Sequence, residues 1–174
     1  VTSLDFSPDA NQLAVAVVSS QMRLWDIRLH TRIAYAFPVL PPNGHQDHTN
    51  VVAFSPDGHT VVFGTHDAHV DYWDPSTNHV RHLTPSHSNQ MASVRFSSDK
   101  HRFLSASGDH TWQMWDYAEG VPKSVRGTAD APVYDAVFLP DGLRVVTCDR
   151  SGAVRLWDAN TGADLGVLHK FPQP

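Results

Sequence analysis

The sequence has a single cysteine, Cys148, among its 174 residues. One cysteine cannot form a disulfide within the chain, which fits a protein of a reducing compartment. A compact chain of this length buries about 70% of its unfolded surface, so it can build a sizeable apolar core. We therefore expect an intracellular protein, with the cytoplasm favoured and the nucleus as the alternative.

Long apolar runs and an excess of basic residues are also missing. The longest apolar run is LAVAVV, residues 13–18, whereas a membrane-spanning helix needs about 18 apolar residues or more. The chain has 13 Lys and Arg against 18 Asp and Glu, a formal net charge of −5. Such a chain does not attract phosphate backbones or anionic lipid. We expect neither insertion into a membrane nor binding to nucleic acid.

The sequence has no sustained 3.6-residue periodicity, so we predict no helix. Instead, one pattern occurs four times: a turn that begins with Phe, and a Trp-Asp pair whose Trp stands 19 residues after that Phe. The turns FSPD, FSPD, FSSD and FLPD begin at Phe6, Phe54, Phe96 and Phe138, and the tryptophans are Trp25, Trp73, Trp115 and Trp157. The Phe residues are 48, 42 and 42 positions apart. A period of this kind indicates a repeat fold.

Each repeat contains four short segments with the composition of β-strands. In the second repeat, NVVAF and TVVFGT are rich in β-branched and aromatic residues, HVDYWD alternates, and HVRHL supplies a fourth strand. Pro56-Asp57-Gly58 predicts a turn between the first two, because proline fixes φ and glycine tolerates positive φ. Four short antiparallel strands repeated every 40 to 45 residues or so are typical of a β-propeller blade. The sequence predicts an all-β fold of four blades, each a four-stranded antiparallel sheet.

These Trp-Asp pairs and their upstream turns resemble the WD-repeat β-propeller family over nearly every residue from 1 to about 169. The resemblance implies a single propeller segment over 1–174, with blades at about 1–40, 45–86, 87–128 and 129–170. The sequence begins directly in a strand-like pattern, VTSLDF, so we expect a piece of a longer chain. Because repeats bury their apolar faces only against neighbours, we expect further blades of the same chain, or self-association, to cover the outer sheets.

The resemblance also implies a buried tetrad in each blade: a Trp on the third strand, a hydroxyl on the second, an Asp in the turn between them and a His before the first. An indole N–H donates, a hydroxyl accepts and donates onward, an imidazole can do either, and a carboxylate accepts, so the bonds can form a chain. Two blades match by spacing, with His45, Thr65, Asp67 and Trp73 in the second and His87, Ser107, Asp109 and Trp115 in the third.

The outer two blades depart from this pattern. In the first, Val17 and Ser19 stand at the hydroxyl and Asp positions. In the fourth, Ala129 replaces the His, while Asp149 and Ser151 stand at the hydroxyl and Asp positions. We expect incomplete tetrads and looser turns in both blades.

Ser107, His87 and Asp109 also have the residue types of a catalytic triad. A triad is recognised by geometry and roles rather than by residue type, and as a tetrad member Ser107 would be a structural relay. A serine hydrolase built on these three residues is the alternative from a different functional class.

Histidines with His-x-x-His spacing raise the question of a metal site. The pairs are His45/His48, His66/His69 and His79/His82. Positions three apart on a strand point to opposite faces, so this spacing favours a metal only in the turn that holds His66 and His69. The sequence has neither a cysteine pair nor a glycine-rich phosphate loop. We predict no metal and no cofactor.

In the family, as the resemblance implies, partners contact the top face at three places per blade: the residue before the tetrad Asp, and those 23 and 25 positions before the Trp. The candidates by spacing are His48, Asn50, His66, Gln90, Tyr134 and Arg150. Tyr134 and Arg150 are favoured, because these residue types are enriched among interface hot spots.

We predict from these positions a non-catalytic scaffold that binds other proteins through top-face loops, as a subunit of a multiprotein complex. The alternative is a substrate-receptor or sensor module of a larger ubiquitin-ligase or signalling assembly. It is suggested by LWDIR at residues 24–28, which partly matches the Trp-Asp-x-Arg ending of some WD-repeat substrate receptors.

Overall fold

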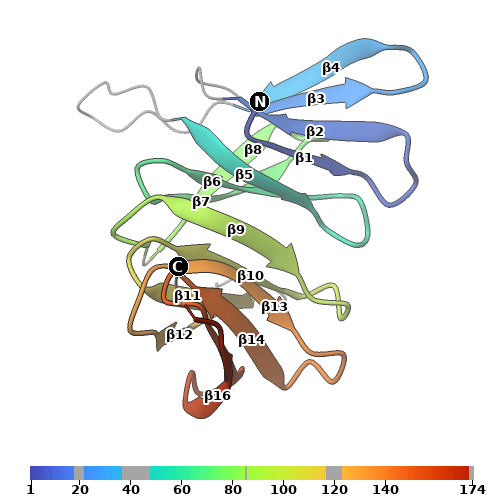
Figure 1. The fold of residues 1–174 in the computed structure, drawn as a ribbon. Coiled ribbons are helices and arrows are strands. Elements are labelled where there is room, and N and C mark those ends of the chain that lie inside the picture. Colours follow the sequence, from blue (N-terminus) through green and yellow to red (C-terminus); the bar gives the residue numbers. More distant parts are fainter. Residues whose placement is uncertain (18–21, 37–47, 85, 117–122, 173–174) are drawn as a thin grey trace. The chain divides into compact units, whose positions relative to one another are not determined.

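The computed structural model describes residues 1–17, 22–36, 48–84, 86–116 and 123–172 (Figure 1). These residues form sixteen β-strands and no helix. The strands make four sheets of four, and neighbours within each sheet are consecutive in the chain. The prediction of an all-β fold with four four-stranded antiparallel blades is confirmed. A membrane-crossing helix is accordingly absent from the part of the chain that the structure describes.

Each sequence repeat forms one sheet (Figure 1). Sheet 1 contains β1 (Ser3–Phe6), β2 (Gln12–Ala16), β3 (Met22–Asp26) and β4 (Thr31–Ala36). Sheet 2 contains β5 (Thr49–Phe54), β6 (Val61–Thr65), β7 (Val70–Asp74) and β8 (His79–Leu83). Sheet 3 contains β9 (Met91–Phe96), β10 (Arg102–Ser107), β11 (Thr111–Asp116) and β12 (Lys123–Thr128). Sheet 4 contains β13 (Val133–Phe138), β14 (Arg144–Asp149), β15 (Ala153–Asp158) and β16 (Asp164–Lys170).

The chain divides into two compact units, Val1–Met91 and Ala92–Pro174. Unit 1 holds sheets 1 and 2, and unit 2 holds sheets 3 and 4 apart from Met91. Each unit has an apolar core to which both of its sheets contribute. The core of unit 1 consists of Ala14, Ala16, Met22, Leu24, Val52, Phe54, Val61, Phe63 and Trp73. The core of unit 2 consists of Leu104, Ala106, Trp112, Met114, Ala129, Val133, Ala136, Val145, Trp157 and Ala159.

The four repeated turns between first and second strands are closed by their aspartates. In each turn the Asp carboxylate accepts the backbone N–H of the residue two positions later, at 2.9 to 3.1 Å. The four aspartates are Asp9, Asp57, Asp99 and Asp141. The glycines that follow two of them have φ of 76° (Gly58) and 65° (Gly142), which glycine adopts without strain. The sequence motif is thus a self-contained turn, which explains why it marks the repeats so clearly.

In sheets 1, 2 and 4 the aspartate of the Trp-Asp pair closes the turn between the third and fourth strands. Asp26 accepts the Leu29 N–H at 2.8 Å, and Asp74 accepts the Ser76 N–H and hydroxyl at 2.8 and 2.7 Å. Asp158 does the same for Thr161, which donates both its N–H and its hydroxyl at 2.9 Å. Hydrogen bonds to a carboxylate favour its charged form, and the Ser76 and Thr161 hydroxyls accordingly lower the pKa of Asp74 and Asp158.

Within unit 1, β1 and β5 lie against each other. They are the first strands of sheets 1 and 2. The Asp5 carboxylate accepts the Phe54 N–H at 2.7 Å, and the Ser3 hydroxyl accepts the Val52 N–H at 3.3 Å. At Thr49, the first residue of β5, the carbonyl accepts a hydrogen bond from the Thr2 hydroxyl at 2.9 Å. Only the bond to Thr49 lies at the start of β5, next to the candidate binding residues His48 and Asn50.

Candidate partner-binding surface

The acceptor of the repeat tryptophan is set by the register between the second and third strands. Trp115 on β11 pairs with Phe103 on β10, and its indole N–H donates to the Ser105 hydroxyl at 2.9 Å. Ser105 shares a face with Phe103 and lies two residues further along. Ser107 lies four residues along, or roughly 13 Å at about 3.3 Å per residue. The prediction that Ser107 accepts from Trp115 is therefore wrong.

The same geometry recurs in sheet 4 and fails in sheet 2. Trp157 pairs with Val145 and donates to the Thr147 hydroxyl at 2.8 Å, so Asp149 is not its acceptor. In sheet 2 the equivalent of Thr147 is Phe63, which has no hydroxyl, and Trp73 donates to the Asn78 side chain at 3.2 Å. The prediction that Thr65 accepts from Trp73 is therefore wrong. Ser105 and Thr147 each stand ten positions before the Trp of their repeat. A hydroxyl residue at that position is the sequence signal that could have identified the acceptor.

Thr65, Ser107 and Asp149 close the turn between second and third strands. The Thr65 hydroxyl accepts the His69 N–H at 3.1 Å, and the Ser107 hydroxyl accepts the Asp109 N–H at 3.1 Å. Asp149 accepts the N–H and hydroxyl of Ser151 at 2.8 and 2.6 Å and the Ala153 N–H at 3.2 Å. The looser turn predicted for sheet 4 is wrong, because one carboxylate closes it with three bonds.

The remaining tetrad residues are placed as follows. Asp109 accepts the N–H and hydroxyl of Thr111 at 3.0 and 2.6 Å. Asp67 is exposed, and its carboxylate lies 3.8 Å from Nδ1 of His66, so the predicted burial fails there. His87 is buried and belongs to unit 1, while His45 lies outside the described residues. The links through the two histidines stay predictions.

The structure brings candidate binding residues of sheet 2 together, and in sheet 4 it brings Arg150 to Pro132, which stands 25 positions before Trp157. The His66 N–H donates to the His48 carbonyl at 2.8 Å, and the Arg150 N–H donates to the Pro132 carbonyl at 2.8 Å. In both sheets this bond ties the start of the first strand to the turn between second and third strands. The positions transferred by spacing are thus neighbours within each sheet.

Asn50 and Tyr134 occupy β-bulges, which sequence reasoning did not foresee. The register between β5 and β6 shifts between Thr49 and Val51, and the register between β13 and β14 shifts between Val133 and Asp135. A bulge re-aims the side chain of the extra residue and is common next to functional sites. We call His48, Asn50 and His66 the bulge end of sheet 2, and Pro132, Tyr134 and Arg150 the bulge end of sheet 4.

The bulge end of sheet 4 offers an aromatic ring and a cation to solvent. Tyr134 is 54% exposed, and Arg150 is exposed in the β14–β15 turn. Among the described residues none forms an ion pair with Arg150, whereas the nearby Arg155 is held by Asp130 and Asp164 and Arg95 by Asp135. Gln90, the candidate of the third repeat, is exposed just before β9.

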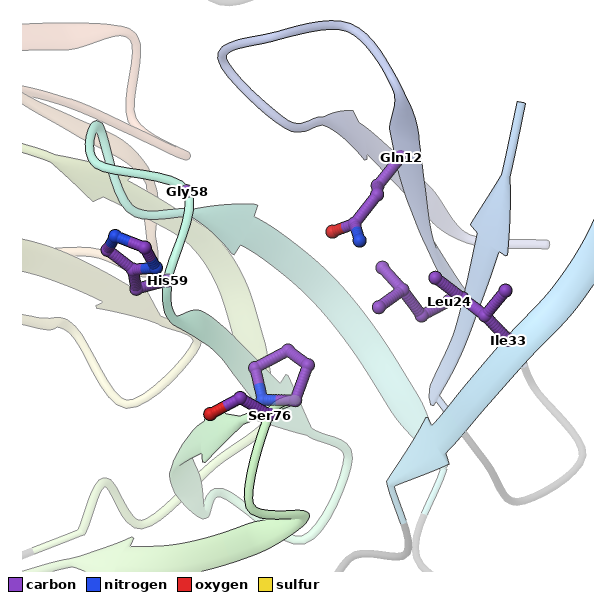
Figure 2. A pocket seen from close by; sticks show the side chains of 7 residues that line it. Gln12, Leu24, Ile33, Gly58, His59 and Ser76 are labelled. Carbon is purple, nitrogen blue, oxygen red and sulfur yellow. The ribbon is translucent and has the colours of Figure 1, made fainter. Parts of the chain in front are cut away.

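Unit 1 also contains an open cavity of about 280 Å³ that the sequence did not predict. Figure 2 shows the side chains that line it, from β2, β3 and β4 of sheet 1 and from two turns of sheet 2. These residues are Gln12, Leu24, Ile33, Gly58, His59, Pro75 and Ser76. The turns involved join β5 to β6 and β7 to β8, at the other end of sheet 2 from the β6–β7 turn that holds His66. No cluster of three metal-ligating side chains was found within the described ranges.

Four consecutive four-stranded meanders, three of them with a Trp-Asp turn closed by its aspartate, define a protein of the β-propeller repeat class. The chain belongs to the WD-repeat family. The family model for the anaphase-promoting complex subunit 4 WD40 domain matches residues 4–99. The model for the WD domain, G-beta repeat, matches residues 121–158.

The chain spans less than half of the length of the curated relatives described here. The chain is 25% identical to transducin beta-like protein 3 of Bos taurus, over 100% of its own length and 22% of that protein. It is 30% identical to periodic tryptophan protein 2 of Arabidopsis thaliana, over 67% of its length and 12% of that protein. An uncharacterized WD repeat-containing protein of Synechocystis is 29% identical, over 84% of this chain and 40% of that one.

Proposed function

We propose that the chain is a non-catalytic scaffold that binds protein partners through the bulge ends of sheets 2 and 4. The observation that carries this proposal is the recurrence of the bulge at Asn50 and Tyr134, each beside a turn bound to the start of its first strand. Two equivalent bulges in one chain indicate a repeated device for aiming side chains outward. Tyrosine and arginine supply rigid contact area and hydrogen-bond donors, which suits protein interfaces.

A scaffold fits the third repeat better than a serine hydrolase does. Ser107 is fully buried, and its hydroxyl accepts the Asp109 N–H. A nucleophile has to be reachable by its substrate, and a fully buried hydroxyl is not. The Asp109 carboxylate accepts two hydrogen bonds from Thr111, which help to close the turn. We propose on these grounds that the chain performs no chemistry of its own and uses no cofactor or metal.

The family match supports a role in a multiprotein complex. One matching model describes a domain of an anaphase-promoting complex subunit, so WD-repeat domains of this kind occur in large assemblies. We propose that the chain is a subunit of such a complex inside the cell, in the cytoplasm or the nucleus, without binding nucleic acid. A substrate-receptor or sensor role in a ubiquitin-ligase or signalling assembly is the narrower form of this proposal. Residues 1–174 would act as one propeller segment whose outer sheets are covered by further blades or another copy.

Affinity capture with matched variants tests the binding surface. The double variant Tyr134→Ala/Arg150→Ala removes both exposed side chains at the bulge end of sheet 4. Loss of two hot-spot residues costs roughly 2 kcal/mol of binding or more, so partner recovery should fall sharply while the thermal midpoint stays unchanged. Leu143→Ala is the control, because Leu143 is 57% exposed in the β13–β14 turn of the same sheet. Unchanged recovery in the double variant would reject this surface.

A further inference from the structure

In unit 2, an arginine of sheet 3 packs against the β13–β14 turn of sheet 4. Arg102 stands at the start of β10, 13 positions before Trp115, and its side chain is 17% exposed. Its guanidinium carbon lies 5.1 Å from the centre of the Phe138 ring. A Cβ added to Gly142 would come within 2.8 Å of Nη2 of Arg102, so the guanidinium lies directly against the turn. A guanidinium is thus part of the packing between these two sheets.

The charge of Arg102 is balanced by the aspartate of the preceding turn. Nε of Arg102 donates to Oδ2 of Asp99 at 2.6 Å, and Nη2 lies 2.6 Å from the same oxygen. Sheet 4 has the same pair, in which Nε of Arg144 donates to Asp141 at 2.8 Å. The planar guanidinium presents its N–H donors in a fork that suits a carboxylate. Arginine and turn aspartate therefore act together in unit 2.

Unit 1 has the equivalent place without the arginine. Gln12 stands 13 positions before its Trp, where sheet 3 has Arg102, and Gly58 takes the place of Gly142. The Gln12 side chain is shorter and uncharged, and its amide forms no hydrogen bond within the described residues. Figure 2 shows this side chain extending from β2 into the space that the turn of Gly58 faces. The cavity of about 280 Å³ therefore lies where a guanidinium packs in unit 2.

Four aspartates adjoin this cavity. Asp57 and Asp74 come just before lining residues in the two turns of sheet 2. Asp26 pairs with Gln12 across β2 and β3, and Asp9 closes the β1–β2 turn just before Gln12. Within the described ranges none of the four forms an ion pair with Lys or Arg. Since aspartate carboxylates are charged at neutral pH, this end of unit 1 complements a cation.

The apolar lining of the cavity suits the aliphatic part of a long cationic side chain. Leu24 is 1% exposed and Ile33 is 45% exposed. Ile33 is the extra residue of a β-bulge, because the register of β3 and β4 shifts between Leu24 and Trp25. A bulge re-aims the side chain of that residue, and Figure 2 shows Ile33 beside Leu24. Arginine packs its methylene groups on such a surface while its charged head stays in water.

We propose that this cavity binds an arginine side chain of a partner protein, at the place equivalent to that of Arg102 in unit 2. The methylene groups of the arginine pack on Leu24 and Ile33. Its guanidinium pairs with the Asp9 carboxylate, as Arg102 pairs with Asp99. The cavity lies at the opposite end of sheet 2 from its bulge end, so this interaction surface is additional to the one under the proposed function.

An NMR titration of the chain with three blocked peptides tests the proposal. The probes are acetyl-Gly-Ser-X-Ser-Gly-amide, in which X is Arg, Lys or Leu. We expect the Arg peptide to give saturable shifts of the backbone N–H signals of Gly58, His59 and Ser76. The Lys peptide should bind more weakly, because an ammonium lacks the planar fork, and the Leu peptide should give no shifts. Equal binding of the Lys or the Leu peptide would overturn the proposal, as would the absence of shifts with the Arg peptide.

Two variants of unit 1 test the residues involved. Gln12→Arg supplies a guanidinium from the chain itself and should remove the shifts caused by the Arg peptide. Asp9→Asn keeps the volume and removes the charge, and should weaken binding about two- to fivefold, as for an exposed ion pair. Asp130→Asn removes an exposed charge of unit 2 and should bind like the unaltered chain. Unchanged binding by a folded Gln12→Arg chain would overturn the proposal.

The reciprocal variant Arg102→Gln opens the equivalent place in unit 2. In the folded variant the Arg peptide should shift the N–H signals of Gly142 and Leu143 as well, and the absence of this second set would contradict the equivalence of the two places. Partner recovery through Tyr134 and Arg150 should be the same in Gln12→Arg as in the unaltered chain. Failure at the cavity therefore leaves the bulge end of sheet 4 standing.

Discussion

The Trp115 indole N–H donates to the Ser105 hydroxyl at 2.9 Å, and both side chains are fully buried. Replacing Ser105 with Ala leaves a buried N–H without its acceptor, which costs about 1 to 3 kcal/mol. We expect this loss of unfolding free energy in urea denaturation. Thr147→Val, which keeps the volume but removes the acceptor of Trp157, should behave alike. Ser98→Ala, at an exposed position, should stay within about 0.5 kcal/mol of the unaltered chain. Equal stability of all three variants would refute the role of these bonds.

Asp149 closes the β14–β15 turn through three hydrogen bonds to one carboxylate oxygen. Asp149→Ala should therefore free the backbone N–H groups of Ser151 and Ala153. Hydrogen–deuterium exchange at these two residues should accelerate relative to the unaltered chain, because exchange follows local opening. Ser151→Ala removes only the hydroxyl and should affect exchange less. If the turn exchanged at the same rate in Asp149→Ala, the carboxylate would not be what closes it.

The repeated turn aspartates make stability depend on acid pH. The Ser7 hydroxyl and the Asn11 side chain and N–H lower the pKa of Asp9 from 3.8 to about 2. The pKa of Asp141 is lowered by the Leu143 N–H and by Arg144. At Asp57 and Asp99 partial burial opposes the shift, but hydrogen bonds from neighbouring groups outweigh it and the pKa is lowered there too.

A carboxylate whose pKa is lower in the folded state stabilises that state fully above its unfolded pKa of about 4. The contribution of these aspartates is lost as the pH falls through their folded values, toward 2 for Asp9. We expect the thermal midpoint to drop between pH 4 and about 2, and the drop to be smaller in Asp9→Asn. A midpoint that does not change over this range would contradict the assignment.

The thiol of Cys148 should react slowly at neutral pH. Partial burial, followed by the Asp135 and Asp149 carboxylates, raises the pKa of Cys148. Because the thiolate is the reactive form, maleimide labelling at pH 7 should be slower in the folded chain than in urea, and should accelerate with rising pH. Asp135→Asn should speed the reaction at fixed pH. These rates are compared at one low protein concentration, and equal rates in folded and unfolded chains would contradict the prediction.

The repeats could be predicted because each carries its own turn chemistry. Asp57 and Asp74 close turns within a few residues of themselves, so the sequence pattern and the local structure coincide. The acceptor of the tryptophan could not be chosen from the spacing used, since Ser105 and Ser107 share a strand face. Only the pairing of Trp115 with Phe103, a property of the whole hairpin, separates them.

The bulges were missed for a different reason. Neither Asn50 nor Tyr134 is a glycine or proline, so neither carries a sequence signal of irregular backbone. Their extra residue is visible only when the two strands are aligned. The partner positions were transferred by spacing alone, and the structure adds that two of them sit where the backbone re-aims the side chain.

A photo-crosslinking amino acid placed at position 134 tests the scaffold account most directly. With the crosslinker at 134, the account predicts covalent capture of a protein partner that is also recovered by the unaltered chain and lost with Arg150→Ala. With the crosslinker at 143, on the other end of sheet 4, the same partner should not be captured. Capture from 143 and not from 134, in chains with unchanged thermal midpoints, would contradict the account.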